Sequence, residues 1–217
     1  VSFIEGAPSY EIVKDTAWDF LEFTKHEGEL ASVCDAVSFG SMSQRHPVSH
    51  EATQVFLSEA KNALKIFDVN LRMDLFTAQI LDEGCRVANL VKLNDEEIGA
   101  VAPLLDLPCG NALEQSEAIC EKYDLEAVVF TRGKRGTAAL TGKGWIEGAP
   151  ASFPLADNAD SVGAGDACTA ALLTARLLGR SWQNSLDMAN QHGAFVASQA
   201  GATPHLPPEI LGLFKLA

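Results

Sequence analysis

Between residues 33 and 131 the chain alternates short apolar runs with longer segments of helical periodicity, and this alternation restricts the fold more than any other feature. Strands that alternate with helices of roughly 10–15 residues are typical of a parallel sheet with crossover helices. We predict strands over 33–39, 66–69, 87–93 and 127–130, and helices over 50–64, 75–84, 95–105 and 112–123. The chain is therefore expected to form an α/β domain.

The segments on either side of this alternation have weaker patterns. Turn residues and short apolar alternation at the start of the chain indicate strands, and an Ala-rich stretch near the end indicates a helix. The remaining expectations are two short strands around a turn within 1–14, a short helix or structured connection over 16–24, a hairpin of 137–141 and 144–147, and a closing helix over 182–200.

A glycine-rich stretch, Gly163-Ala-Gly165, precedes a long Ala/Leu run that continues to Gly179, a typical helix stop. The first turn of a helix presents unpaired N–H groups and the positive end of the helix dipole. Such a loop therefore suits an anion, most often phosphate. Asp166 falls in this first turn, where it could accept a proton from an attacking hydroxyl. Taken alone, the pattern is also that of a tight turn with an acidic helix cap.

Polar residues follow several of the expected strands at the point where each strand ends. In an open parallel sheet, ligands bind beyond the carboxyl ends of the strands. The polar groups are Asn70–Arg72, Asn94–Glu97, Thr131–Gly136, the loop at 160–166, and the set Asn190, Gly193 and Gly201. We expect these five groups to line one crevice.

The string Asp160-Ser-Val-Gly-Ala-Gly-Asp166 resembles the signature of the ribokinase-like (PfkB) carbohydrate kinases, Asp-Thr-x-Gly-Ala-Gly-Asp, with Ser161 replacing the usual Thr. The resemblance implies a ribokinase-like α/β fold, with a central, mainly parallel sheet between helices in three αβα layers and a small β lid. It also implies that the amides of Gly163, Ala164 and Gly165 form an anion hole for the transferring phosphate. Asp166 would be the catalytic base.

The segment that follows the strand at 66–69 contains Asp68, Asn70 and Arg72 at alternating positions, which would place them on one side of a strand end. An arginine fork can hold a phosphate through two parallel hydrogen bonds. A surface arginine paired to a carboxylate is an equal alternative for the isolated pattern. The segment resembles the Asp-x-Asn-x-Arg of the same family, and this resemblance assigns Arg72 to the transferring phosphate.

Asn94 and Glu97 stand three residues apart at the start of an expected helix. This spacing is that of a capping box, in which the side chain of each residue accepts a hydrogen bond from the backbone N–H of the other residue. Oxygen ligands also suit Mg²⁺, which keeps several waters and binds substrate phosphates. The pair resembles the Asn-x-x-Glu motif of the family, which implies that Asn94 and Glu97 help to place Mg²⁺, through water, and the phosphate of the nucleotide. Capping and metal binding can coexist.

Two further segments resemble the nucleotide site of the family. Thr131-Arg-Gly-Lys-Arg-Gly136 is similar to a strand-ending Thr-x-Gly-x-x-Gly, which assigns Thr131, Gly133 and Gly136 to ATP. Its three positively charged side chains, Arg132, Lys134 and Arg135, favour binding of a polyphosphate, although a basic surface loop has the same composition. Asn190 and Gly193 match the small-residue helix beside the adenine, for which tight helix packing is the ordinary alternative.

A monovalent cation, K⁺, is expected behind the signature loop, as in some relatives. The resemblance places it on carbonyl groups near Asp160, Val162 and Gly201.

Bulk properties exclude several classes of protein. A net charge of −13 argues against a nucleic-acid binder, which needs a basic face. Apolar runs are too short for a membrane span of about 20 residues. The five cysteines, at 34, 85, 109, 120 and 168, are odd in number and form no Cys-x-x-Cys pair, which favours free thiols in a reducing cytoplasm.

The resemblance implies an ATP-dependent phosphotransferase that acts on the alcohol group of a sugar. Residues 8–19 resemble bacterial fructokinase-like members locally, so fructose is the expected substrate. A nucleoside or 2-keto-3-deoxygluconate is the nearest rival substrate. A fructokinase-like binding or assembly protein without catalytic activity is the alternative from another class.

The chain begins at Val1. Members of the family that it resembles carry an earlier segment with the first strands and most sugar contacts, and these 217 residues do not include it. We therefore expect a fragment, with partial lid strands over 1–14 and a truncated nucleotide- and sugar-binding domain over 15–217. A homodimer formed through the lid stays open at this point.

Overall fold

The computed structural model describes residues 2–4, 7–9, 11–108 and 110–215, with only the backbone described before residue 11. Gly6, which falls within the turn expected in residues 1–14, and Cys109, expected to be a free thiol, lie outside these ranges. The chain divides into two compact units. The helical unit comprises Val1–Ile12, Arg132–Ala138 and Ile146–Ala217, and the sheet unit comprises Val13–Thr131 and Ala139–Trp145.

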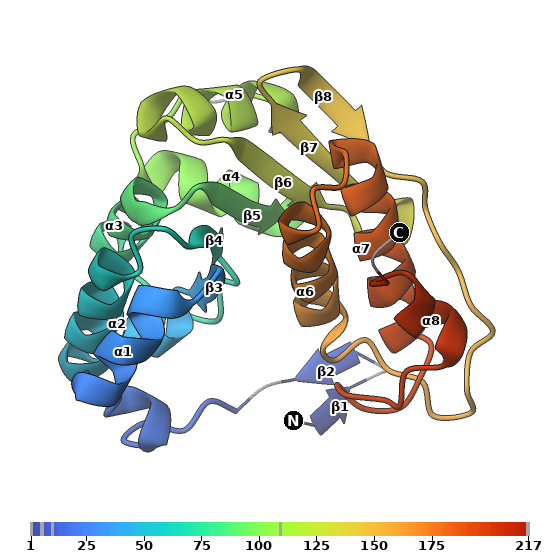
Figure 1. The fold of residues 1–217 in the computed structure, drawn as a ribbon, viewed down its shortest axis with the longest axis horizontal. Coiled ribbons are helices and arrows are strands. Elements are labelled where there is room, and N and C mark those ends of the chain that lie inside the picture. Colours follow the sequence, from blue (N-terminus) through green and yellow to red (C-terminus); the bar gives the residue numbers. More distant parts are fainter. Residues whose placement is uncertain (1, 5–6, 10, 109, 216–217) are drawn as a thin grey trace. The chain divides into compact units, whose positions relative to one another are not determined.

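The sheet unit is built on the main sheet, which has six strands in the order β3-β4-β5-β6-β7-β8 over the described residues (Figure 1). The strands are β3 (Ala36–Gly40), β4 (Leu64–Asp68), β5 (Leu90–Asn94), β6 (Ala127–Thr131), β7 (Thr137–Thr141) and β8 (Gly144–Glu147). Strands β3 to β6 are parallel, with Gly40 opposite Asp68, Asp68 opposite Lys92, and Asn94 opposite Thr131. The first residues of β7, up to Ala138, and the last residues of β8, from Ile146, are assigned to the helical unit.

Helices connect the parallel strands of the main sheet. They are α2 (Pro47–Glu59), α3 (Ala78–Val87), α4 (Asp95–Leu104) and α5 (Ala112–Tyr123), with the short 3-10 turn η2 (Met42–Gln44) before α2. The 3-10 turn η1 (Ala17–Asp19) and helix α1 (Lys25–Val33) precede β3. Each of β4, β5 and β6 lies directly beside the preceding strand. Because such crossovers are right-handed, a strand order that never reverses places α2, α3, α4 and α5 on one face of the sheet.

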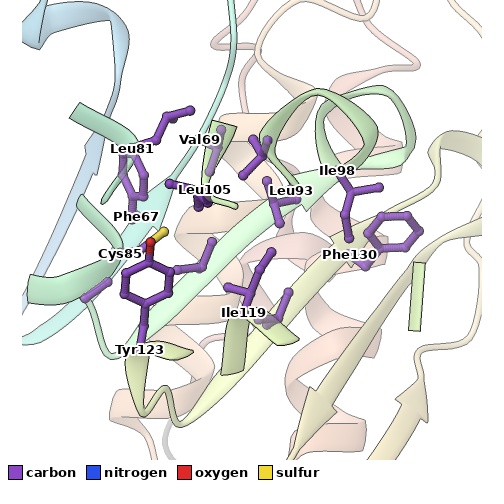
Figure 2. Packing of buried hydrophobic residues seen from close by; sticks show 14 of the residues in the cluster. Phe67, Val69, Leu81, Cys85, Leu93, Ile98, Leu105, Ile119, Tyr123 and Phe130 are labelled. Atoms are coloured by element: carbon purple, nitrogen blue, oxygen red, sulfur yellow. The ribbon is translucent and has the colours of Figure 1, made fainter. Parts of the chain in front are cut away.

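The core of the sheet unit lies between this face and its helices. Figure 2 shows Phe67 of β4 beside Leu81 of α3, and Phe130 of β6 beside Ile98 of α4. Leu93 of β5 and Ile119 of α5 belong to the same cluster. All six side chains are at most 5% exposed. In the central strands β5 and β6, the residues that face the other side of the sheet are buried as well. Strands buried on both faces read as continuous apolar runs, which explains the runs in the sequence.

Gly84 of α3 allows this helix to approach β4 closely. A Cβ atom at Gly84 would lie 2.7 Å from two ring atoms of Phe67, which is fully buried and stacks on Phe39. We therefore expect Gly84→Ala to lower the free energy of unfolding by about 1–3 kcal/mol through overpacking, less the helix propensity that alanine adds. Chemical denaturation measures the change.

The matched control for this substitution is Gly99→Ala in α4, where an added Cβ would meet no atom within 4 Å. Alanine there is expected to stabilise the protein by up to about 1 kcal/mol. Equal effects of the two substitutions would contradict the close approach of α3 to β4.

A buried ion pair anchors the segment before α1. Arg45 donates from Nε and Nη2 to the two carboxylate oxygens of Asp19, both at 2.7 Å, and Nη2 also donates to the Val13 carbonyl. The Arg45 hydrogen bond lowers the pKa of Asp19 to about 2. The predicted short helix or connection at 16–24 is thus the turn η1, held by Arg45.

The helical unit contains β1 (Ser2–Ile4) paired antiparallel with β2 (Ala7–Ser9), η3 (Gly133–Arg135), α6 (Ala164–Leu177), α7 (Trp182–Val196) and α8 (Pro208–Gly212). Helices α6 and α7 run side by side (Figure 1). Gly193 permits this, because a Cβ there would lie 3.1 Å from the Ala164 carbonyl oxygen. Phe195 packs edge-to-face on Phe153 in the core of this unit.

The predicted elements are largely confirmed, with shifted ends. The two short strands within 1–14, the helix at 112–123 and the strands at 137–141 and 144–147 occur as expected. Other bounds were wrong by several residues, since β3 begins at Ala36, α2 spans Pro47–Glu59 and α7 ends at Val196. Helices α1 and α8 were missed.

Two further expectations concern the whole chain. Among the described residues, no helix is long and apolar enough to cross a membrane. Cys34, Cys85, Cys120 and Cys168 are free thiols, as predicted.

Candidate functional site

The signature loop enters α6 in the helical unit. Gly163 is the cap residue, with φ at +78°, and Ala164 is the first helical residue. The Ala164 N–H donates to the Ser161 carbonyl at 3.3 Å. The N–H groups of Gly165 and Asp166 follow in the first turn, where a helix supplies no acceptor and Gly163 has no side chain that could accept. A 14-residue helix adds its dipole, so this end is suited to an anion.

Asp166 is the third residue of α6, and its side chain is exposed. A carboxylate in this position interacts favourably with the helix dipole. Its exposure also leaves it accessible to a substrate hydroxyl. The geometry is therefore compatible with a general base, whereas the cap position itself is occupied by Gly163 and α6 has no side-chain cap.

The carboxylate of Asp160 links the signature loop to the segment after α7. Oδ1 accepts from the Val162 N–H and Oδ2 from the Gly201 N–H, both at 2.9 Å, while the Asp160 N–H donates to the Gln199 carbonyl. The three residues predicted to surround a monovalent cation, Asp160, Val162 and Gly201, are thus brought together. The cation itself stays a prediction.

Asn190 of α7 joins two segments of the helical unit. Its Oδ1 accepts from the N–H and the hydroxyl of Thr137, and its Nδ2 donates to the Ala149 carbonyl, each at 2.9 Å. Gly136 and Gly148 lie against this amide, because an added Cβ would approach Nδ2 to 2.9 and 2.7 Å. Asn190 and Gly136, assigned to the nucleotide, therefore have a structural function, and their contact with ATP stays a prediction.

The basic loop after β6 forms η3, with Gly133 at φ +55°. Arg132 pairs with Glu147, Nη1 to Oε1, at 3.0 Å, and its side chain is largely buried. Lys134 and Arg135 are exposed. The pair with Glu147 offsets one of the three charges that the sequence suggests for a polyphosphate.

In the sheet unit, the segment after β4 leaves the extended conformation at once. Asn70 and Met73 adopt φ values of +44° and +49°, in the left-handed region. Asp68, Asn70 and Arg72 therefore do not alternate along a strand, and the expectation of one shared strand side was wrong. Arg72 Nη1 donates to the Leu71 carbonyl at 2.9 Å.

The capping box at the start of α4 is confirmed. Asn94 Oδ1 accepts from the N–H groups of Glu96 and Glu97, and Glu97 Oε2 accepts from the Asn94 N–H. Glu97 Oε1 accepts from the Leu71 N–H at 2.9 Å. Burial raises the pKa of Glu97, and the two backbone donors oppose this effect.

These contacts bear on the fit of Mg²⁺, which the family implies. The oxygens of Asn94 and Glu97 are engaged by backbone N–H groups, so they are not arranged as direct ligands. Among the described residues, no group of three or more His, Cys, Asp and Glu side chains could hold a metal ion. Binding of Mg²⁺ through water by Asn94 and Glu97 stays a prediction.

Sequence reasoning missed Lys92 as a partner in this region. Its Nζ lies 2.7 Å from Asp68 Oδ2, and both side chains are largely buried. A lysine within the apolar run of β5 was the available signal, because a buried charge requires a partner. Thr131 lies at the end of β6, opposite Asn94, and its hydroxyl donates to the Leu93 carbonyl.

The predicted residues thus fall into two groups. In the sheet unit, the first group lies at or just beyond the carboxyl ends of the adjacent strands β4, β5 and β6, as expected, and consists of Arg72, Asn94, Glu97 and Thr131. The helical unit holds the signature loop, Gly133, Gly136, Asn190, Gly193 and Gly201.

Comparisons with known proteins agree with these observations. A family model described as pfkB family carbohydrate kinase matches residues 14–209. A fructokinase of Salmonella thompson is 32% identical over 152 residues, which are 65% of this chain and 65% of that protein.

Two solved structures are also similar. An aminoimidazole riboside kinase from Salmonella enterica, complexed with aminoimidazole riboside and an ATP analog, has a TM-score of 0.71 at 17% identity, covering 94% of this chain and 70% of that chain. A putative ribokinase II from E. coli with ATP and Mg²⁺ has a TM-score of 0.68 at 18% identity, covering 81% and 56%. These likenesses confirm the predicted ribokinase-like α/β fold.

Proposed function

Because the chain belongs to the pfkB family of carbohydrate kinases, we propose that it is part of an ATP-dependent kinase that phosphorylates a sugar hydroxyl, with fructose as the acceptor. The chain spans 65% of the length of the Salmonella thompson fructokinase that it matches. The activity proposed is that of the whole protein. The observation that carries the proposal is the uncapped start of α6 at Gly163, with the exposed Asp166 in its first turn.

In the proposed reaction, Asp166 accepts the proton of the attacking sugar hydroxyl as its oxygen bonds to the γ-phosphorus of ATP, while the bond from this phosphorus to the departing ADP oxygen breaks. The amides of residues 163–165, together with the positive end of the α6 dipole, stabilise charge on the transferring phosphoryl group. Arg72 contributes a further positive charge. Bound ATP supplies the phosphoryl group, and Mg²⁺ neutralises phosphate charge when bound.

The proposed nucleotide contacts are Asn94, Thr131, Gly133, Gly136, Asn190 and Gly193, with K⁺ near Asp160, Val162 and Gly201. Two similar solved structures are complexes with ATP, and one of them also contains Mg²⁺, which supports both cofactors for this family. The K⁺ ion, a homodimer through the lid and a cytoplasmic location stay predictions.

Fructose is supported by the two Salmonella fructokinases, each 32% identical over 152 residues. A nucleoside-type acceptor is the second candidate, because similar folds include an aminoimidazole riboside kinase and a nucleoside kinase complexed with inosine. An exposed Asp166 in the signature loop favours an enzyme over a binding or assembly protein without catalysis.

A coupled assay of ADP release, with the protein's N-terminus verified by intact mass, tests this proposal. We expect release with fructose above the rate without any acceptor. Inosine, ribose and 2-keto-3-deoxygluconate serve as competing acceptors. Release with inosine alone would reassign the substrate, and nucleotide binding without ADP release on any acceptor would refute the kinase.

A further inference from the structure

The turn after β4 carries an unusual amount of backbone strain. Asn70 and Met73, which flank Leu71 and Arg72, both have φ in the left-handed region. For a residue with a side chain this region costs about 1–2 kcal/mol, although asparagine tolerates it better than methionine. Such conformations persist only where surrounding contacts hold them.

Contacts on both sides of the turn provide this hold. Before it, the Val69 N–H donates to the Lys92 carbonyl at 3.0 Å, and the Ser41 hydroxyl donates to the Val69 carbonyl at 2.7 Å. Asp68 is fixed by Lys92. Within the turn, the Leu71 N–H donates to Glu97 Oε1. Glu97 is thus a side chain from another element that reaches into the strained segment.

The carboxylate of Glu97 serves two loops at once. One oxygen binds the Leu71 N–H of the β4–α3 turn, and the other binds the Asn94 N–H at the start of α4. The residue is only 6% exposed, and its capping-box geometry fixes the direction of its side chain. A hydrogen bond to a charged group is stronger than one between neutral groups. The start of α4 therefore determines the position of the Leu71 backbone.

We propose that Glu97 is a positioning residue for Arg72, acting through the backbone of the β4–α3 turn rather than through a metal ion. Arg72 directly follows Leu71, so the clamp on Leu71 sets where the guanidinium can lie. This inference rests on the proposed kinase function for the role of Arg72. The clamp itself is a property of the chain without ligands.

Amide hydrogen exchange, measured by NMR on the protein without nucleotide or metal, tests the clamp directly. Glu97→Gln keeps the side-chain shape but presents an NH₂ group to one of the two backbone donors. We expect the protection factor of the Leu71 amide to fall by about tenfold to hundredfold. This range corresponds to the free energy of a hydrogen bond to a charged group. Glu96→Gln, on the exposed neighbour, is the matched control and should leave Leu71 unchanged. Wild-type protection of Leu71 in Glu97→Gln would overturn the proposal.

Kinetics separate positioning from metal binding and from a general loss of structure. We expect Glu97→Gln to lower kcat with an unchanged apparent affinity for Mg²⁺, and to add little to the kcat loss of Arg72→Ala in the double variant. Additive losses, or a tenfold weaker apparent Mg²⁺ affinity, would overturn the positioning role. A wild-type protein without ADP release would refute the proposed function alone, because the exchange result still decides the clamp.

Discussion

Replacement of Asp166 by asparagine is expected to lower kcat by about 10²- to 10⁴-fold, the range typical of a single general base. Asparagine preserves the size of the side chain but cannot accept the hydroxyl proton. Asp166 is exposed at the start of α6, so its replacement leaves the packing of the helical unit intact. ADP release at saturating acceptor and nucleotide measures the effect. The midpoint of thermal unfolding should stay within a few degrees of the wild-type value.

The control for this variant is Asp157→Asn, an exposed carboxylate of the same acidic segment. It changes the net charge equally and should keep full activity. A variant of Asp166 that retains kcat within a few-fold would remove this residue from the mechanism. Equal losses for both variants would assign the effect to local charge instead.

Replacement of Gly163 by alanine is expected to have the largest effect on structure near the site. The φ of +78° costs a residue with a side chain about 1–2 kcal/mol. The new Cβ would also lie 2.6 Å from the Ala202 carbonyl oxygen and 2.8 Å from its Cα. Backbone atoms cannot rotate away, so the loop or the segment at Ala202 must shift. Overpacking of this kind adds about 1–3 kcal/mol.

We therefore expect Gly163→Ala to destabilise the protein by at least about 2 kcal/mol and to abolish most ADP release. Gly179→Ala is the matched control at the other end of α6. Its φ is +69°, but an added Cβ there would meet no atom within 4 Å. The control should lose about 1 kcal/mol from strain alone and keep its activity. Similar unfolding curves for the two variants would contradict the contact between Gly163 and Ala202.

The strands and helices could be predicted where local patterns agree with tertiary packing. Helix α5 was predicted with its correct bounds because Asn111 and Glu114 form a capping box at its start and the apolar period continues to Tyr123. Helix α1 was missed although Thr24 and Glu27 offer the same signal, because its short apolar stripe is weak. Helix α8 is a single turn with few local signals beyond its proline.

The candidate site was predictable in the identity of its motifs but not in its contacts. The capping box of Asn94 and Glu97 is local and could be expected from spacing. The bond from Leu71 to Glu97 spans 26 positions, and that between Lys92 and Asp68 spans 24. No sequence period predicts either contact, because each depends on the register of neighbouring strands. The left-handed turn at Asn70 was equally hidden, because alternating polar residues suggest a continuing strand.

The strand order of the sheet unit also has a consequence for how the chain acquires its structure. Each of β4, β5 and β6 pairs with the strand that precedes it in the sequence. Each pairing therefore spans a single helical crossover, which keeps the sequence separation of the paired strands low for a parallel sheet. As the chain leaves the ribosome, each new strand meets a finished edge, so this part of the sheet can grow in the direction of synthesis. Glu97 emerges after the turn that it holds, so the Asn70–Met73 turn adopts its final form only when the start of α4 has been made.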